Sequence, residues 1–321
     1  MSEKLGIDHE VLARAGQRIR SGGVVAFPTE TVYGLGADAR NPAAVEQIFR
    51  IKHRPRNSPL IVHVDSIRMA CELVQDWPVE AQRLAERFWP GPLTMVLHKL
   101  PVIPDVVTAG LHTVGIRMPA HPVALALIRE AGAPIAAPSA NPFTRLSPTT
   151  ARHVKDALGE KVDLILDGGR TPVGIESTVL SLAVSPPHLL RPGMISQKQI
   201  EEVIGPITAV MKASGDMGTE AHPSPGMHPK HYSPHTPLIL VDGGALPSTG
   251  RGVYLWRKIP VSTVAMVPMP EDAVSYAAVL YETLHREDSK GWDWIAVEKP
   301  PCTPEWDGIW DRLSRAAVQI S

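Results

Sequence analysis

Short apolar runs recur through the first part of the chain, separated by amphipathic stretches of uneven length. Runs bounded by turn residues are typical of buried strands, whereas apolar positions three and four apart are typical of helices that bury one face. Because the helices fall unevenly between the strands, the pattern favours a mixed sheet over a regular series of strand–helix–strand units. Strands are expected at residues 24–27, 60–64, 93–97, 114–118, 135–137, 164–166, 178–182 and 189–190, and helices at 8–19 and 41–52.

The pattern changes after residue 205, where an expected helix ends at a glycine. Residues 211–237 are rich in Gly, Pro, Ser and His without a sustained period, which predicts a linker of about 25 residues. Beyond it, strands alternate with connecting segments and two long helices, a pattern typical of a small Rossmann-like domain with a mainly parallel sheet. Strands are expected there at 238–241, 252–256, 263–267 and 294–297, and helices at 271–286 and 305–317.

The sequence thus predicts an α/β protein with α+β character in its first domain. The expected segments are a larger domain over residues 1–207, a linker over 208–236 and a smaller Rossmann-like α/β domain over 237–321. A chain of 321 residues with 44% hydrophobic positions has enough apolar material for two cores.

Charge and composition narrow the function classes. The formal net charge is -1, so the overall balance does not favour a protein that holds nucleic acid through bulk positive charge. Cys71 and Cys302 fit no metal-ligand spacing, which argues against a disulfide framework or a zinc site. The first residues lack a signal-peptide pattern, and no run approaches the roughly 18 apolar residues of a membrane span. We therefore expect a cytoplasmic protein without a membrane segment.

Polar groups follow several of the expected strands, where loops on a rigid scaffold often carry function. Residues 28–36 combine hydroxyls, a carboxylate and glycines, and are consistent with either a ligand-binding loop or an ordinary turn. Lys52, Arg54 and Arg56 place three permanent cations within five residues. Such a cluster can clamp a triphosphate, although a charge run is more often a solvated helix end.

Arg117 stands in the middle of an apolar run that is expected to be a strand. An uncompensated charge at such a position would cost several kcal/mol, so a partner is required. That partner is either an internal carboxylate or the carboxylate of a ligand held by the forked guanidinium. The residues alone leave both alternatives open.

Further loops at 136–142 and 174–179 bring hydroxyls and small residues to strand ends. Ser177 fits no nucleophile-elbow pattern and has no obvious histidine partner, so it is not expected to be a nucleophile. Cations and hydroxyls without a covalent catalyst match phosphoryl or nucleotidyl transfer, where positioning and charge stabilisation do most of the work. Four linker histidines fit no common ligand spacing, and no metal site is expected there. They are His222, His228, His231 and His235.

The motifs form an ordered set that covers nearly the whole chain. They are PTETVYGL at 28–35, KHRP at 52–55, PLIVH at 59–63, WPGPLT at 89–94, VGIRMP at 114–119, APSAN at 137–141, DGG at 167–169, GIESTV at 174–179, LRPG at 190–193 and SPGMHPKHYSP at 224–234. Each is weak alone, but together and in this order they are highly specific. The chain resembles the threonylcarbamoyl-AMP synthase family in its two-domain form, which implies a YrdC-like twisted mixed sheet with flanking helices, followed by the Rossmann-like domain.

The resemblance implies roles for individual residues. The family's Lys-x-Arg and Ser-x-Asn hallmark falls on Lys52, Arg54, Ser139 and Asn141, with Lys52 and Arg54 as catalytic residues. ATP would be surrounded by Lys52, Arg54, Ser58, Thr113, Ser139, Asn141, Ser147 and Arg191, and covered by Tyr232 of the linker. Threonine would be held by Thr31, His63, Arg117 and Ser177, with the small Ala137 leaving room beside it.

The implied reaction joins L-threonine, bicarbonate or CO2, and ATP into L-threonylcarbamoyl-AMP with release of pyrophosphate, the first step toward threonylcarbamoyladenosine in tRNA. Mg²⁺ is expected to arrive with ATP rather than to occupy a protein cage. The implied partners are downstream tRNA threonylcarbamoyl-transferase proteins, without a stable nucleic-acid complex. Many relatives have glycine where His53 and Thr144 stand, which leaves the shape of the nucleotide loops open.

Two other functions compete with this interpretation. An RNA-binding factor could use a concave surface of the first domain, but the strands lack the basic, aromatic-rich pattern that stacks bases. A carbamoyl-adenylate-forming enzyme with another acceptor is also possible, although the acylphosphatase-like and zinc segments of the related maturases are missing. We expect the small domain to position the linker as a lid over the ATP pocket.

Overall fold

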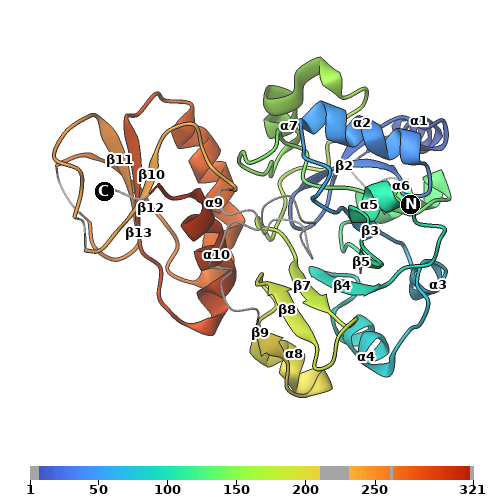
Figure 1. Cartoon of the computed structure of the whole chain (residues 1–321). Coiled ribbons are helices and arrows are strands. Elements are labelled where there is room, and N and C mark those ends of the chain that lie inside the picture. Colours follow the sequence, from blue (N-terminus) through green and yellow to red (C-terminus); the bar gives the residue numbers. More distant parts are fainter. Residues whose placement is uncertain (1–6, 210–230, 244, 261–262, 319–321) are drawn as a thin grey trace.

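The chain is built on two separate sheets, one in each of two lobes (Figure 1). The computed structural model describes residues 7–209, 231–243, 245–260 and 263–318. The N-terminal lobe contains a nine-stranded sheet in the order β1-β2-β6-β3-β5-β4-β7-β8-β9, and the C-terminal lobe a four-stranded sheet in the order β10-β13-β11-β12. The first sheet mixes parallel and antiparallel pairs, whereas all pairs of the second are parallel. Both sheet types are as the sequence predicts.

The N-terminal lobe alternates strands and helices irregularly. Its strands are β1 (Val25–Pro28), β2 (Tyr33–Asp38), β3 (Ile61–His63), β4 (Leu93–His98), β5 (Thr113–Arg117), β6 (Ile135–Ala136), β7 (Thr178–Ser181), β8 (His188–Arg191) and β9 (Thr208–Ala209). Its helices are α1 (His9–Arg20), α2 (Pro42–Lys52), α3 (Ile67–Cys71), α4 (Val79–Phe88), α5 (Asp105–Thr108), α6 (Pro122–Ala131), α7 (Ala151–Leu158) and α8 (Gln197–Ile204), with a 3-10 turn at Gly159–Lys161.

Helix boundaries follow the capping residues of the sequence. The Asp8 carboxylate accepts a hydrogen bond from the backbone N–H of Glu10 at 2.9 Å and starts α1. Asn41 caps α2, and Pro42 takes the first helical position, where its missing N–H costs nothing. These caps fix α2 so that Lys52 stands in its last turn.

Three features differ from the expected strands. Residues 33–38 form β2, which pairs antiparallel with β1, where the sequence was interpreted as a continuous polar loop. Three of these six residues are Gly or Ala, at positions 34, 36 and 37, and they hide the strand signal because small residues have little β-propensity. Residues 164–166 are not a strand, since only Ile165 makes an isolated bridge, to Ala26. The short β9 lies just past the expected boundary at residue 207 and still extends the first sheet.

The C-terminal lobe places its helices between its own sheet and the N-terminal lobe (Figure 1). Its elements are β10 (Leu238–Val241), β11 (Gly252–Trp256), β12 (Ala265–Pro268), α9 (Ala273–Asp288), β13 (Trp294–Glu298), a 3-10 turn at Pro304–Trp306 and α10 (Asp307–Ala316). Its core also includes Val32, Leu146 and Ile175 from the N-terminal lobe and Tyr232 from the linker. The two lobes are therefore joined by a shared apolar core.

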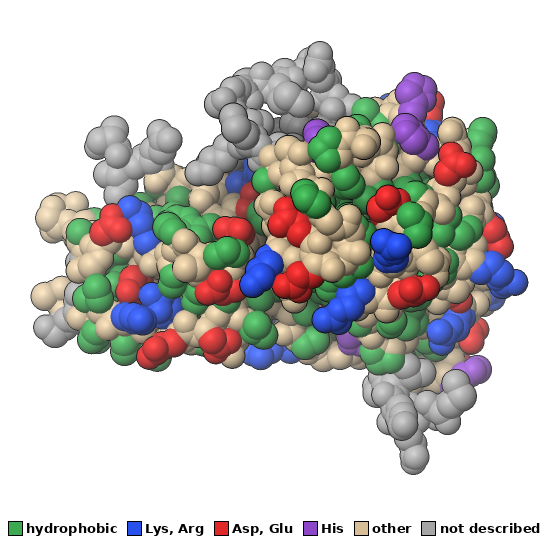
Figure 2. All heavy atoms as spheres, turned by 90° about the horizontal axis from the view of Figure 1, so that it is seen from below, with side chains coloured by type: hydrophobic (Ala, Val, Ile, Leu, Met, Phe, Trp, Pro, Cys, Tyr) green, Lys and Arg blue, Asp and Glu red, His purple; other side chains and the backbone are tan. Residues whose placement is uncertain are grey.

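The outer face drawn in Figure 2 mixes acidic and basic side chains without a continuous basic field. Among the described residues, no helix is both long and apolar enough to cross a membrane. The mixed charge on this face matches the near-zero net charge of the chain.

Candidate functional site

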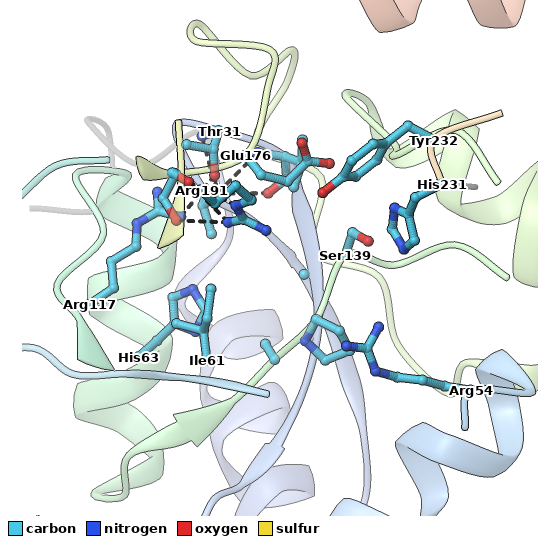
Figure 3. Close-up of a pocket in the computed structure, with 16 residues that line it drawn as sticks. Thr31, Arg54, Ile61, His63, Arg117, Ser139, Glu176, Arg191, His231 and Tyr232 are labelled. Carbon is cyan, nitrogen blue, oxygen red and sulfur yellow. Dashed lines mark hydrogen bonds between the residues drawn. The ribbon is translucent and has the colours of Figure 1, made fainter. Parts of the chain in front are cut away.

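One pocket collects side chains from strand ends and loops of the N-terminal lobe, together with the end of the linker (Figure 3). The space measures about 540 Å³ including its open mouth. Its lining residues are Thr29, Thr31, Val32, Gly34, Arg54, Ile61, His63, Arg117, Ala137, Pro138, Ser139, Glu176, Ser177, Arg191, His231 and Tyr232.

The expected threonine residues all line this pocket. Thr31 follows β1, His63 ends β3, and Arg117 ends β5, which pairs in parallel with β3. Parallel pairing brings the carboxyl ends of β3 and β5 to the same edge of the sheet, so His63 and Arg117 are direct neighbours in register. Ala137 and Ser177 complete the set from the loops after β6 and before β7.

Arg117 is paired with an internal acid. Its Nη2 lies 2.6 Å from Glu30 Oε1, and the two side chains are only 4% and 7% exposed. Arg117 Nη1 also donates to Thr31 Oγ1 at 2.9 Å, and Glu30 Oε2 accepts from the backbone N–H of Ala120. Of the two partners that the sequence left open, the internal carboxylate is therefore present. Arg117 nevertheless faces the same pocket as Ser139 and Ser177.

His63 is held in its neutral form. Burial, and then the neighbouring Arg117, lower the pKa of His63 to about 3, because both disfavour a second positive charge. Its ring meets Phe27 edge to face, and within the described part of the chain Nδ1 has no hydrogen-bond partner. His63 therefore lines the pocket as a neutral imidazole.

Two further guanidinium groups, of Arg54 and Arg191, line the pocket (Figure 3). Arg54 Nη2 donates to Ser58 Oγ at 2.5 Å and to Pro59 O at 3.1 Å, which fixes its direction. Burial, and more weakly Arg191, lower the pKa of Arg54 to about 10, so the group remains charged at neutral pH. Arg191 donates to the Ser177 carbonyl and hydroxyl at 3.0 and 3.2 Å.

Lys52 does not line the pocket. Its ammonium is buried and donates to the backbone carbonyls of Ser139, at 2.5 Å, and Asn141. Burial, with a smaller effect of Arg54, holds the pKa of Lys52 well below its ordinary value. The lysine thus ties the end of α2 to the loop that carries Ser139, instead of presenting its charge to the cavity.

Four other residues expected around ATP do not line the pocket either: Ser58, Thr113, Asn141 and Ser147. Ser58 supports Arg54, Asn141 donates to Arg145 O at 2.8 Å, and Ser147 donates to Glu176 Oε1 at 2.5 Å. Thr113 begins β5, whose far end is Arg117, and this puts the two about 13 Å apart at the rise of a β-strand. Arg54, Ser139, Arg191 and Tyr232 are the members of the expected ATP set that line the pocket.

Several lining residues carried no role in the sequence interpretation. Glu176 stands within the GIESTV motif, and His231 precedes Tyr232 in the linker motif, so their positions beside assigned residues were the available signal. Burial and surrounding cations hold the pKa of His231 well below its ordinary value. Residues 210–230 of the expected lid, with His222 and His228, lie outside the described residues.

His53 and Thr144 adopt left-handed backbone conformations, with φ of 51° and 70°. Glycine adopts such angles without strain, whereas a β-branched residue such as threonine rarely does. The two positions where many relatives have glycine thus require glycine-like geometry.

The described residues contain no cluster of three or more His, Cys, Asp or Glu side chains that could hold a metal ion. Glu176 is the carboxylate among the described lining residues, and its oxygens already accept hydrogen bonds from Ser147, Tyr281 and Arg312. This donor set does not fit a protein cage for Mg²⁺, which prefers several oxygen ligands.

Three arginines, several hydroxyls and a neutral histidine around one cavity define an α/β protein that binds small anionic ligands. Comparisons with known proteins identify the family to which the chain belongs. Residues 17–193 match the Sua5/YciO/YrdC family model, described as telomere recombination, and residues 195–318 match a model described as the C-terminal domain of threonylcarbamoyl-AMP synthase.

The chain is 44% identical to the threonylcarbamoyl-AMP synthase of Bacillus subtilis, over 99% of this chain and 96% of that protein. The crystal structure of Pyrococcus abyssi Sua5 complexed with L-threonine has a TM-score of 0.90, 38% identity and coverage of 97% and 95% of the two chains. Escherichia coli YciO matches 58% of this chain at 27% identity and a TM-score of 0.52. The chain belongs to the threonylcarbamoyl-AMP synthase family.

Proposed function

We propose that the chain catalyses the ATP-dependent formation of L-threonylcarbamoyl-AMP from L-threonine and bicarbonate, with release of pyrophosphate. The observation that carries this proposal is that Arg117, His63, Thr31 and Ser177 share one pocket with Arg54, Ser139 and Arg191. Membership of the family supports the reaction type, and the L-threonine complex of the Pyrococcus abyssi relative supports the amino acid.

The amino acid would bind at the Arg117 end of the pocket. The Arg117 guanidinium and the Thr31 hydroxyl offer hydrogen-bond donors to a carboxylate, which a planar guanidinium binds well. Because Glu30 already neutralises Arg117, this end of the pocket does not hold an uncompensated charge before substrate arrives. His63 would stay neutral beside the amino acid, so it can accept a hydrogen bond without repelling an ammonium group.

The nucleotide phosphates would bind toward Arg54 and Arg191. Both guanidinium groups are charged, buried and oriented by hydrogen bonds, so little reorganisation is needed when an anion arrives. Lys52 would act indirectly in this arrangement, because its ammonium holds the two carbonyls that shape the Ser139 loop. We thus assign Lys52 a positioning role and Arg54 direct contact.

The chemistry needs no protein nucleophile. The amine nitrogen of threonine bonds to the carbon of bicarbonate or CO2 and loses a proton, and with bicarbonate one water leaves. A carbamate oxygen then attacks the α-phosphorus of ATP, and the bond from that phosphorus to the pyrophosphate oxygen breaks. Holding the carbamate and the α-phosphate in register lowers the barrier by removing the entropy cost of their encounter.

Magnesium would enter with the ATP phosphates and supply charge neutralisation there. The chain's own part is to hold those phosphates with Arg54 and Arg191. We place the reaction in the cytoplasm, which suits the exposed free thiols Cys71 and Cys302, and propose that the product passes to tRNA threonylcarbamoyl-transferase proteins.

Pyrophosphate release from ATP, measured with each amino acid in turn and with or without bicarbonate, tests the proposal. We expect release that requires both threonine and bicarbonate. Release that proceeds equally with other amino acids, or without bicarbonate in degassed buffer, would contradict it. Salt-sensitive RNA binding without any pyrophosphate release would instead favour the RNA-binding alternative.

A further inference from the structure

At two glycines, the helices of the C-terminal lobe pack directly against the backbone of loops that carry pocket residues. A Cβ added at Gly174 would lie 2.2 Å from the Ala277 carbonyl oxygen of α9, and one at Gly308 of α10 would lie 2.9 Å from the Gly193 backbone. Gly193 in turn leaves no room beside Ser177 and Thr178, with 2.9 Å to the Ser177 carbonyl carbon. The backbones of helix α10, of the loop after Arg191 and of residues 177–178 at the start of β7 are therefore in close contact.

Arg312 of α10 connects the same segments through its side chain. Its Nε donates to Glu176 Oε2 at 2.7 Å, its Nη2 to the Glu176 carbonyl at 2.9 Å, and its Nη1 to the Pro192 carbonyl at 2.8 Å. The guanidinium also lies over the Tyr232 ring, with Cζ 5.3 Å from the ring centre. One side chain of the C-terminal lobe thus holds the neighbours of Ser177 and Arg191 and contacts the linker.

The site around Arg312 is fully buried and polar, which makes its geometry specific. Arg312 is 1% exposed, and its partner Glu176 also accepts hydrogen bonds from Ser147 and from Tyr281 of α9. Breaking such a buried pair by removing one partner is costly, and Lys cannot reproduce the fork of three directed donors. Ion pairs at the lobe surface, such as Arg170 with Glu282 at 2.7 Å, lack these constraints.

We propose that Arg312 is a positioning residue for the reaction, and that the C-terminal lobe acts in catalysis by fixing the place of the hydrogen-bonded Ser177 and Arg191 in the pocket wall. This inference rests on the proposed function and deepens it, because Ser177 belongs to the threonine end and Arg191 to the nucleotide end. Arg312 itself does not line the pocket. Its effect reaches both substrates through the loops 174–178 and 191–193.

The test compares Arg312→Lys and Gly308→Ala with Glu282→Gln, a matched control that removes an exposed ion pair between the lobes. Gly308→Ala changes none of the side chains in the Arg312 cluster, but its added Cβ forces α10 away from Gly193. Steady-state pyrophosphate release gives kcat and both KM values, and hydrogen exchange of peptides covering 174–178 and 191–195 reports the loops directly.

We expect kcat/KM for threonine and for ATP to fall by about 30-fold in Arg312→Lys and Gly308→Ala, with faster exchange confined to the two loops, and to change less than about twofold in Glu282→Gln. Folded variants with kcat/KM near that of the control would overturn the inference. So would lost activity with exchange raised evenly along the chain, because that outcome indicates a general structural role. If the unmodified chain shows no threonine-dependent release, the proposed function fails, while loop exchange still decides whether Arg312 holds the pocket wall.

Discussion

Replacing Glu30 by glutamine removes the internal counter-charge of Arg117 while keeping the shape of the side chain. The pair joins atoms 2.6 Å apart in side chains that are 4% and 7% exposed, so water cannot replace the lost carboxylate. Leaving one buried charge unpaired costs about 3–5 kcal/mol. For a protein of this size the melting temperature should therefore drop on the order of 10 °C.

Threonine should bind the Glu30→Gln variant more tightly than it binds the unmodified chain. In the unmodified protein a substrate carboxylate at Arg117 must share the guanidinium with Glu30, whereas in the variant it becomes the counter-ion. We expect the threonine Kd to fall by about tenfold, equivalent to about 1.4 kcal/mol. The threonine-induced rise in melting temperature should increase accordingly.

Isothermal titration calorimetry and thermal melts measure both quantities on the same samples. Glu46→Gln is the control, because it removes an acid from the exposed Arg56–Glu46 pair at 3.0 Å. Threoninol, which lacks the carboxylate, should gain nothing from the Glu30 substitution. Weaker threonine binding in Glu30→Gln, or an equal gain for threoninol, would refute a carboxylate site at Arg117.

Three other expectations follow from single residues. Lys52→Met should orphan the carbonyls that the ammonium holds, lower the free energy of unfolding by about 3 kcal/mol, and raise KM for ATP more than KM for threonine in steady-state assays. Thr144→Gly should raise the free energy of unfolding by about 1 kcal/mol in urea titrations, because it relieves a φ of 70°. An unchanged midpoint would argue that the loop adapts. His63 has its folded-state pKa lowered to about 3 from 6.5, so the unfolded chain protonates first and stability is lost as pH falls between these values. His63→Gln should remove about 1.4 kcal/mol per pH unit of that dependence, and parallel profiles would contradict the assignment.

Much of the fold could be predicted from local signals. Asp8, Asn41 and Pro42 mark helix starts unambiguously, and the apolar run 238–241 forms β10 of a parallel sheet as expected. Strand β2 could not be recognised from the sequence, because its glycines give no hydrophobic signal. They are small because they pack closely between Phe27 and residues 135–137. The identity of this strand depends on tertiary contacts, which periodicity does not report.

One part of the site could be predicted from the sequence, namely the charged residue that interrupts the apolar run 114–118. Arg117 required a partner on energetic grounds alone, but the sequence could not choose Glu30 over a ligand, because the two residues lie 87 positions apart. Lys52 does not line the pocket, because its ammonium donates to two backbone carbonyls, and a charge cluster in the sequence does not show which of its members turns inward. The role of Arg312 could not be predicted from the sequence, because its partners in residues 176 and 192 become its neighbours only when the two lobes pack together.

Mass spectrometry of the adenylate formed from ATP, threonine and carbon-13 bicarbonate tests the central claim most directly. We predict a product that contains AMP, threonine and one carbon from bicarbonate, and that disappears in Arg117→Ala at threonine concentrations that saturate the unmodified chain. An adenylate without the labelled carbon, or undiminished product from Arg117→Ala, would contradict the account.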